Sequence, residues 1–352
     1  MIELDNLHYD FRQIDGYNKA FNFIMSPREL GKTTMFWLKK AYLQWKKNKK
    51  PWIYCVRQSV EICEALINTI TDTILNKFTD DNVELEYKKG SFKEGITDVY
   101  IKGERFFRII ALKIDMQRIK KAGIKNVAGV VMDEYIVNPK LQEKYLVGEA
   151  DKIKEAYTTW NREADGFLRW YFLGNPYSLF NPMFLYWKVD TNKLKPNEFY
   201  VGNDYVIHTP TLSEELKAKV LAKNPLYQFD EDYMQYALLG KPINDKNIKL
   251  GELPQNFQLR YVFFICNKYL GVFSNTNITL TEDRFYIKEL ESVSKYRSIW
   301  CFDFDELLEG VQLLSREERF MFARLKDSFR RRQISFSNIN VYYLFKEVYQ
   351  NL

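Results

Sequence analysis

Three short segments in the first half of the chain carry the side chains best suited to chemistry. The first, residues 26–33, reads Ser-Pro-Arg-Glu-Leu-Gly-Lys-Thr and fits a Walker A loop in which serine replaces the usual first glycine. In such a loop, backbone N–H groups surround a β-phosphate, the lysine neutralises phosphate oxygens and the hydroxyl coordinates Mg²⁺. The segment predicts an ATP site made by Ser26, Pro27, Arg28, Glu29, Leu30, Gly31, Lys32, Thr33 and Thr34.

The sequence around this loop strengthens the prediction. About one chain in six of this length would contain Gly-Lys-Ser/Thr by chance, since glycine makes up about 7% of residues. Here a largely apolar run at residues 22–25 enters the loop, and Met35, Leu38, Tyr42 and Trp45 follow Gly31 at helical spacing. The order of strand, loop and helix is the one that phosphate binding requires.

The second segment, residues 127–134, reads Val-Ala-Gly-Val-Val-Met-Asp-Glu. A buried strand that ends in two carboxylates is costly unless a charged partner such as Mg²⁺ is present. Asp133 is therefore predicted to hold the metal together with Thr33, and Glu134 to polarise the attacking water. That last role is needed for hydrolysis but not for transfer to a bound acceptor. The alternative is a surface Asp-Glu pair after an ordinary core strand.

The third segment is an apolar run at residues 170–173 followed by Gly174-Asn175-Pro176. An asparagine at the end of such a strand can contact the γ-phosphate and the attacking water, although Asn-Pro is also an ordinary turn signal. With Lys32 and Glu134, Asn175 completes the predicted catalytic set.

The elements that must position these segments alternate between apolar strands and helical patterns over the first two hundred residues. This alternation predicts an α/β fold, a P-loop NTPase of the ASCE type with a mostly parallel sheet. Residues 97–114 are expected to form a hairpin around Lys102-Gly103. We predict an ATPase domain at residues 1–207, a helical linker subdomain at 208–246 and a small α+β domain at 247–352.

Composition limits the remaining possibilities. The 352 residues include 52 Lys plus Arg against 46 Asp plus Glu, a net charge of +6, which suits a polyanionic partner but is common without one. No signal peptide or membrane span is expected, so the chain is predicted to be cytoplasmic with no membrane partner. Two histidines, and four cysteines without metal-finger spacing, argue against a zinc site; the cysteines are expected to be buried.

Together, these segments resemble the phage terminase large subunits. Residues 27–33 are similar to their arginine-bearing Walker A, residues 52–57 to their next strand, and residues 118–123 to the Lys- and Gly-containing segment before their Walker B. Residues 174–176 resemble their coupling motif. The short chain and small carboxy-terminal domain resemble, more narrowly, the DNA-packaging ATPases of small tailed phages of the phi29 type.

The resemblance implies a homomeric ring, expected to be a pentamer, that docks on the phage portal (connector) of an empty capsid and threads double-stranded DNA inward. It further implies action in the host cytoplasm, with transient attachment to the viral procapsid. Such rings place hydrolytic sites between subunits, so a basic residue of one subunit can complete its neighbour's site. Arg162 is the implied arginine finger, Lys120 or Lys121 the second donor, and Arg28 a group acting within its own subunit. For each, the alternative is a solvated surface cation.

Large terminases carry a ribonuclease-H-like nuclease at the carboxy-terminal end, which requires several carboxylates around two metal ions. The first candidate strand here, residues 259–265, contains no acidic residue. Asp303, Asp305 and Glu306 form an acidic cluster, but acids at a helix start also satisfy the helix dipole. We therefore expect a vestigial RNase H-like fold without nuclease activity.

A basic helix is predicted at residues 315–332 of this domain. Its apolar stripe of Met321, Leu325 and Phe329 is expected to pack on the core and leave a basic surface for phosphate contacts. That surface suits DNA or the structural packaging RNA that phi29-type motors use. A solvated face is the alternative.

Other classes of protein share parts of this pattern. A helicase or DNA-repair ATPase is the first alternative, and strand separation distinguishes it from a packaging motor. A small-molecule kinase is disfavoured by Glu134 and by the lack of an evident acceptor pocket. A third alternative is a portal-docking scaffold that binds ATP without turnover.

Overall fold

The computed structural model describes residues 8–138, 145–146, 148–164, 166–179, 181–224, 226–242, 248–266, 268–275, 285–294, 297–302 and 306–352. The chain divides into two compact units, Met1–Asn244 and Asp245–Leu352. We call them unit 1 and unit 2. The predicted boundary between residues 246 and 247 lies outside the described residues. No helix of the described part is both long and apolar enough to cross a membrane.

Unit 1 is built on one sheet with the strand order β3-β4-β5-β2-β6-β7-β1-β9-β8. The strands from β5 to β9 in this order run parallel, and β3, β4 and β8 pair antiparallel at the two edges. Strands β1, β2 and β7 are buried along their whole length, as strands covered on both faces require. The bounds are β1 Phe21–Met25, β2 Trp52–Val56, β3 Glu86–Tyr87, β4 Ile96–Ile101, β5 Glu104–Ala111, β6 Gly129–Asp133, β7 Trp170–Gly174, β8 Phe199–Val201 and β9 Tyr205–His208.

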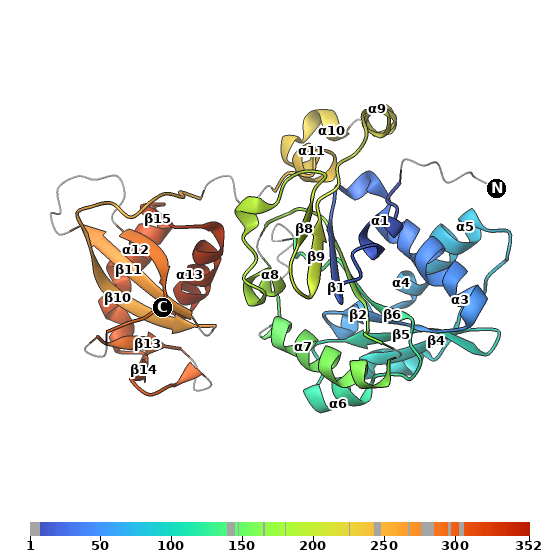
Figure 1. The fold of residues 1–352 in the computed structure, drawn as a ribbon, viewed down its shortest axis with the longest axis horizontal. Helices are drawn as coiled ribbons and strands as arrows, with labels where there is room; N and C mark the ends of the chain where they lie inside the picture. The colour runs from blue at the N-terminus through green and yellow to red at the C-terminus, as the bar shows by residue number, and fades with distance from the viewer. Residues whose placement is uncertain are drawn as a thin grey trace. The chain divides into compact units, whose positions relative to one another are not determined.

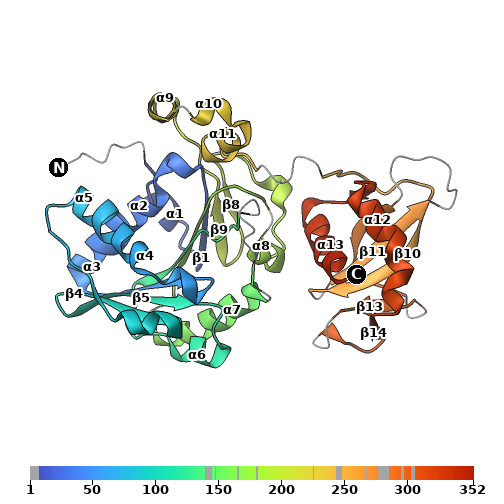
Figure 2. The same ribbon diagram turned by 180° about the vertical axis from the view of Figure 1, so that it is seen from behind.

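Helices cover both faces of this sheet (Figures 1 and 2). One layer contains α1 to α5, with π-helical segments Phe36–Tyr42 and Thr69–Leu75 that continue α2 and α4; the other contains α6 to α8. The last helices of unit 1, α9 to α11, follow the final strand. The bounds are α1 Arg12–Asp15, α2 Lys32–Met35, α3 Leu43–Asn48, α4 Glu64–Asn68, α5 Asn76–Phe78, α6 Met116–Lys121, α7 Glu149–Trp160, α8 Pro182–Tyr186, α9 Glu214–Lys223, α10 Leu226–Phe229 and α11 Glu231–Ala237.

The strand order confirms the predicted P-loop fold. Strand β7 lies between β1, which enters the Walker A loop, and β6, which ends in Asp133. This inserted strand is what the ASCE type requires, because it places a polar residue at its end between the loop and the two carboxylates. The predicted hairpin is also present, since β4 and β5 pair antiparallel on either side of Lys102-Gly103.

Unit 2 contains a sheet with the strand order β14-β13-β10-β11-β12-β15. Strands β10, β11 and β12 form an antiparallel meander, while β13 and β15 pair parallel with β10 and β12, and β14 with β13. Helices α12 and α13 complete the unit. The bounds are β10 Phe257–Ile265, β11 Lys268–Asn275, β12 Phe285–Leu290, β13 Ile299–Cys301, β14 Val311–Leu313, β15 Ile334–Phe336, α12 Ala323–Arg330 and α13 Ile339–Asn351.

Two predictions about side-chain burial are wrong. The basic helix begins as a 3₁₀ segment, Glu318–Phe322, before α12, and the tighter turn shifts the phase of the apolar stripe. Met321 is therefore 52% exposed, and Phe322 is fully buried beside Leu325. Among the cysteines, Cys266 is exposed and Cys63 half-buried, because Cys266 occupies the turn between β10 and β11 with φ of 50°.

Candidate active site

The phosphate loop of unit 1 is shaped by backbone contacts with both of its neighbours. Ser26 continues the pairing of β1 with β7 by donating its N–H to the Gly174 carbonyl at 3.1 Å, and Arg28–Leu30 forms a 3₁₀ turn. Gly31 then adopts the left-handed conformation, with φ of 69°. A Cβ at Gly31 would lie 2.5 Å from Cδ2 of His8, so only glycine fits here.

Lys32 and Asn175 meet at the edge of the sheet where β1 and β7 end. The Lys32 ammonium donates a hydrogen bond of 2.7 Å to Oδ1 of Asn175, and both side chains are buried. Burial lowers the pKa of Lys32 to about 8, although Asp133 and Glu134 oppose the shift. A buried ammonium beside a neutral amide favours an anionic ligand, because an anion would restore the charge compensation lost on leaving water.

Thr33 and Asp133 form the second contact of the site. The Thr33 hydroxyl donates to Oδ2 of Asp133 at 2.8 Å, and burial raises the pKa of Asp133 while Lys32 opposes that shift. The described residues contain no group of three or more His, Cys, Asp or Glu side chains that could hold a metal. A hydroxyl and one carboxylate nevertheless fit Mg²⁺, which takes oxygen ligands and relies on waters and substrate phosphates for the rest.

Glu134 has an unusual backbone conformation for a residue with a side chain. Its φ is 53°, in the left-handed region, which costs about 1–3 kcal/mol for residues other than glycine. The Glu134 N–H donates to Oδ1 of Asp133 at 3.0 Å, and the Glu134 side chain is exposed. The turn points the catalytic candidate away from the sheet and toward solvent, where an attacking water would come from.

Arg57 holds this turn in place, and we did not predict its role from the sequence. It follows β2 and donates to the Glu134 carbonyl at 2.7 Å and to the Tyr135 carbonyl. The guanidinium also forms a buried bidentate ion pair with Glu149, at 2.9 Å from both Nε and Nη2. A charged residue directly after a fully apolar strand was the available signal, but its partner lies 92 positions away.

The segment after Glu134 also contacts β7 closely. A Cβ at Gly174 would lie 2.7 Å from the Tyr135 ring, so the ring rests on the backbone immediately before Asn175. Tyr135 is fully buried. The segment that follows β6 is therefore packed against the last residue of β7 without an intervening side chain.

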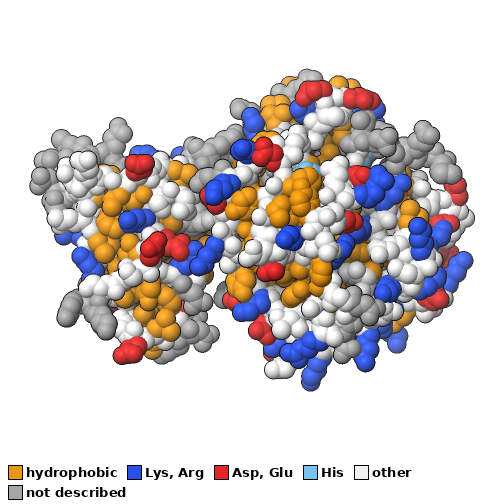
Figure 3. All heavy atoms as spheres, in the orientation of Figure 1, with side chains coloured by type: hydrophobic (Ala, Val, Ile, Leu, Met, Phe, Trp, Pro, Cys, Tyr) orange, Lys and Arg blue, Asp and Glu red, His pale blue; other side chains and the backbone are white. Residues whose placement is uncertain are grey.

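The candidates for action in trans lie away from these residues. Arg162 is exposed in the turn Asn161–Glu163, which precedes β7 and so lies toward the opposite edge of the sheet. Lys120 pairs with Glu155 at 2.8 Å, and Lys121 is exposed at the end of α6. Basic side chains gather over α6 in the space-filling view (Figure 3). Within one chain, none of these cations completes the site.

The remaining residues of the loop have other partners. Glu29 accepts a hydrogen bond of 2.6 Å from the Tyr227 hydroxyl, which ties the loop to α10, and Arg28 is exposed. Thr34 is half-buried in the first turn of α2. Phe11, which precedes the loop, is buried against Phe36 and Tyr171 in the core.

This fold and this arrangement of lysine, hydroxyl and paired carboxylates define the class of P-loop NTPases. Within that class, the family model of the podovirus DNA encapsidation protein (Gp16) matches residues 4–352. The chain belongs to this family, which confirms the resemblance to phi29-type packaging ATPases. No similar sequence was found among curated proteins.

Two solved structures of phage packaging motors are similar to this chain over nearly its whole length. A chain of the bacteriophage phi29 viral genome packaging motor assembly is 22% identical, with a TM-score of 0.71 over 98% of this chain and 99% of that one. The Phi-28 gp11 DNA packaging motor is 14% identical, with a TM-score of 0.62 over 95% of each chain. At these identities, the likeness shows the fold.

Proposed function

We propose that this chain is the ATP-hydrolysing subunit of a motor that translocates double-stranded viral DNA into a preformed capsid. Family membership supports the packaging role. The single observation that carries the enzymatic part is the convergence of Lys32, Thr33, Asp133 and Asn175 at one sheet edge, with Glu134 beside them. ATP and Mg²⁺ are the proposed cofactors, and the motor works in the host cytoplasm while attached to the procapsid.

In the proposed mechanism, the loop N–H groups and Lys32 bind the β- and γ-phosphates, and Lys32 exchanges its contact with Asn175 for phosphate oxygens. Thr33 and Asp133 are the residues that would hold Mg²⁺, which would supply positive charge to the phosphate oxygens. Glu134 accepts a proton from the attacking water, whose oxygen bonds to the γ-phosphorus as the bond to the β-γ bridging oxygen breaks. Asn175 becomes free to contact the γ-phosphate, so its position differs before and after cleavage.

We further propose that hydrolysis occurs at subunit interfaces of a homomeric pentameric ring. Arg162, with Lys120 or Lys121 as a second donor, acts on the neighbour's site. The position of Arg162 supports this, because the turn Asn161–Glu163 precedes β7 and so lies toward the start of that strand rather than its end.

Unit 2 is proposed to dock the motor rather than to cut DNA. Its antiparallel meander, extended by parallel strands next to β10, is the arrangement of RNase H-like sheets and supports a vestigial nuclease fold. Strand β10 carries no acidic residue; Asp303 and Asp305 lie outside the described residues, and Glu306 accepts the Cys266 N–H. The portal, packaging RNA or DNA is the proposed partner.

The experiment that tests the function is a comparison of wild type with Glu134→Gln. The variant keeps the shape of the side chain but cannot accept a proton, so ATP binding should persist while turnover falls by roughly 10² to 10⁴. Binding is measured by equilibrium dialysis and turnover by phosphate release. Unchanged turnover would refute the role of Glu134, and strand separation of duplex DNA by wild type would favour the helicase alternative.

A further inference from the structure

Tyr54 is a buried tyrosine of β2 whose hydroxyl has no part in the proposed hydrolysis. Its side chain is 6% exposed, and its ring packs edge-on against Trp37, with 5.2 Å between the ring centroids and 70° between the ring planes. No described residue forms a hydrogen bond with the Tyr54 hydroxyl. A nearly buried polar group without a protein partner costs free energy unless water or a ligand satisfies it.

The strand register brings Tyr54 to the face of the sheet on which the nucleotide contacts lie. Tyr54 pairs with Val131 of the neighbouring parallel strand β6, and Asp133 follows Val131 by two residues. Because side chains alternate along a strand, these three point to the same face. This is also the face of α2, since the Thr33 hydroxyl donates to Asp133. Tyr54 therefore lies one strand away from Asp133, on the side of the phosphate loop.

The helix that follows the phosphate loop fixes how far Tyr54 lies from the site. Thr33 and Trp37 are four residues apart, where α2 continues into the π-helical segment, so they lie on one face of the helix. Thr33 contacts Asp133, and Trp37, one turn farther from the loop, contacts Tyr54. The two contacts follow one another between helix and sheet, and the Tyr54 ring therefore lies one helical turn from the Thr33–Asp133 contact.

The charges of the site act on the Tyr54 hydroxyl. Burial raises the pKa of Tyr54, and the charges of Asp133 and Glu134 raise it further. The hydroxyl therefore stays protonated and can donate a hydrogen bond, and the charged groups that act on it are carboxylates, which accept one. The hydroxyl of Tyr135 is fully enclosed without a partner among the described residues, whereas that of Tyr54 keeps accessible surface that a water can reach.

The backbone of Glu134 is held in place, but its side chain needs a further contact. Arg57 donates to the Glu134 carbonyl at 2.7 Å and pairs with Glu149 of α7, in the helix layer on the other face of the sheet. These contacts fix the turn and leave the exposed Glu134 carboxylate unrestrained by Arg57. A general base works only when it is held within hydrogen-bond reach of the water. Tyr54 supplies a donor from the face of the phosphate loop.

We propose that Tyr54 is a positioning residue for hydrolysis: its hydroxyl donates a hydrogen bond to an ordered water, and that water donates to the Glu134 carboxylate. One carboxylate oxygen is held in this way, and the other is directed toward the attacking water, whose proton passes to Glu134 as in the proposed mechanism. Tyr54 itself neither gains nor loses a proton. The inference rests on the proposed function, because Tyr54 acts through the general base assigned there.

The test compares Tyr54→Phe with wild type, because phenylalanine keeps the ring against Trp37 and removes only the hydroxyl. Phosphate release should show kcat lowered about tenfold, the effect of one lost hydrogen bond to a charged group. The KM for ATP and the Kd of a non-hydrolysable ATP analogue should change by less than about twofold, since binding is not affected. The melting temperature should stay the same, because no protein partner is lost.

Tyr42→Phe is the matched control, since Tyr42 is buried farther along the same helix and its hydroxyl donates to Asp81 at 2.8 Å. Its kcat should equal that of wild type. In the Glu134→Gln background, Tyr54→Phe should lower the residual turnover by less than about twofold, because the group that it positions is gone.

Three results overturn the inference: an unchanged kcat in Tyr54→Phe, an equal loss in Tyr42→Phe, or a further tenfold loss in the double variant. Each of them leaves the proposed function intact. Wild-type turnover in Glu134→Gln would instead overturn both the inference and the role of Glu134, so the two failures are distinguishable.

Discussion

The two edges of the unit 1 sheet handle charge differently. At the edge where the strands end, the charged groups contact one another or a polar partner, as in Lys32 with Asn175 and Arg57 with Glu149. At the edge where they begin, Arg169 contacts only neutral groups within the described chain. The first edge is preorganised for one ligand geometry, whereas the second carries positive charge that an external partner can use.

The largest expected effect is on ATP turnover, when a cation from one subunit no longer reaches the phosphate loop of its neighbour. Arg162→Ala should lower ATP turnover of assembled rings by roughly 10³ or more, as loss of an arginine finger does. Lys32→Ala should also be inactive. Mixing the two should restore part of the activity, because some interfaces then combine an intact loop with an intact finger. Phosphate release measured in well-mixed rings checks this; Lys39→Ala, an exposed cation, is the control, and no recovery in the mixture would argue against trans action.

The next effect concerns the buried pair. Arg57→Met leaves the Glu149 carboxylate buried without its partner, which should lower the free energy of unfolding by about 3–5 kcal/mol. Arg57→Met combined with Glu149→Leu should recover much of that loss, since both charges are gone. Urea denaturation of both variants measures the difference. Equal destabilisation of the single and double variants would mean that backbone contacts, and not the ion pair, dominate.

The edge where the strands end should also make stability depend on pH, because it contains the buried Lys32. The folded state lowers the pKa of Lys32 from 10.5 to about 8, so between these values the unfolded chain binds more protons and stability rises with pH. Relative to Lys32→Met, wild type should gain about 3 kcal/mol in the free energy of unfolding from pH 7.5 to pH 10.5. Urea titrations at several pH values measure this. If the difference in the free energy of unfolding between wild type and Lys32→Met does not change with pH, the folded state does not lower the pKa of Lys32.

The smallest effect belongs to an ion pair on the surface of α6 and α7. The Lys120–Glu155 pair is partly exposed, with 34% and 44% of the side-chain surfaces accessible. Lys120→Gln should change the free energy of unfolding by less than about 1 kcal/mol, because solvent screens such pairs. A loss comparable to that of Arg57→Met, measured by the same urea titration, would remove the contrast between the buried pair and the partly exposed pair.

Local patterns account for the parts of the site that the sequence predicts. The loop at residues 26–33, the carboxylates after β6 and the asparagine after β7 each lie within a few residues of the strand that positions them. The strand order then brings them together, because parallel neighbours end at one edge. The start of β6 is less well predicted: it begins at Gly129, although the apolar run begins at Val127.

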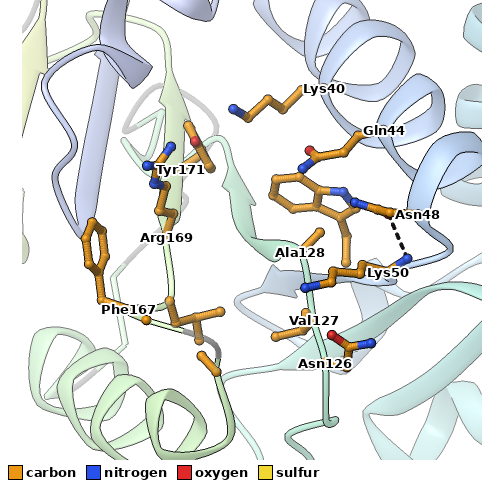
Figure 4. Close-up of a pocket in the computed structure, with 14 residues that line it drawn as sticks. Lys40, Gln44, Asn48, Lys50, Asn126, Val127, Ala128, Phe167, Arg169 and Tyr171 are labelled. Atoms are coloured by element: carbon orange, nitrogen blue, oxygen red, sulfur yellow. Dashed lines mark hydrogen bonds between the residues drawn. The ribbon is translucent and has the colours of Figure 1, made fainter.

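Long-range contacts explain what the sequence could not predict. Nothing local to Arg57 indicates that its partner is Glu149, since only the folded sheet brings α7 beside the end of β2. The exposure of Met321 depends on a 3₁₀ turn that the helical spacing does not reveal. A surface hollow lined by Lys40, Trp52 and Arg169 similarly combines residues from three separated segments (Figure 4).

The contact of the Tyr135 ring with Gly174 connects the turn at Glu134 to the end of β7. A shift of the backbone at residue 134 as the water is consumed would press directly on the strand that ends in Asn175, the residue that holds Lys32. Cleavage of the γ-phosphate next to Glu134 would in this way weaken the contacts of Lys32 with the remaining diphosphate. A larger side chain at position 174 would hold the two strands apart and uncouple release from cleavage, even if each step still occurred.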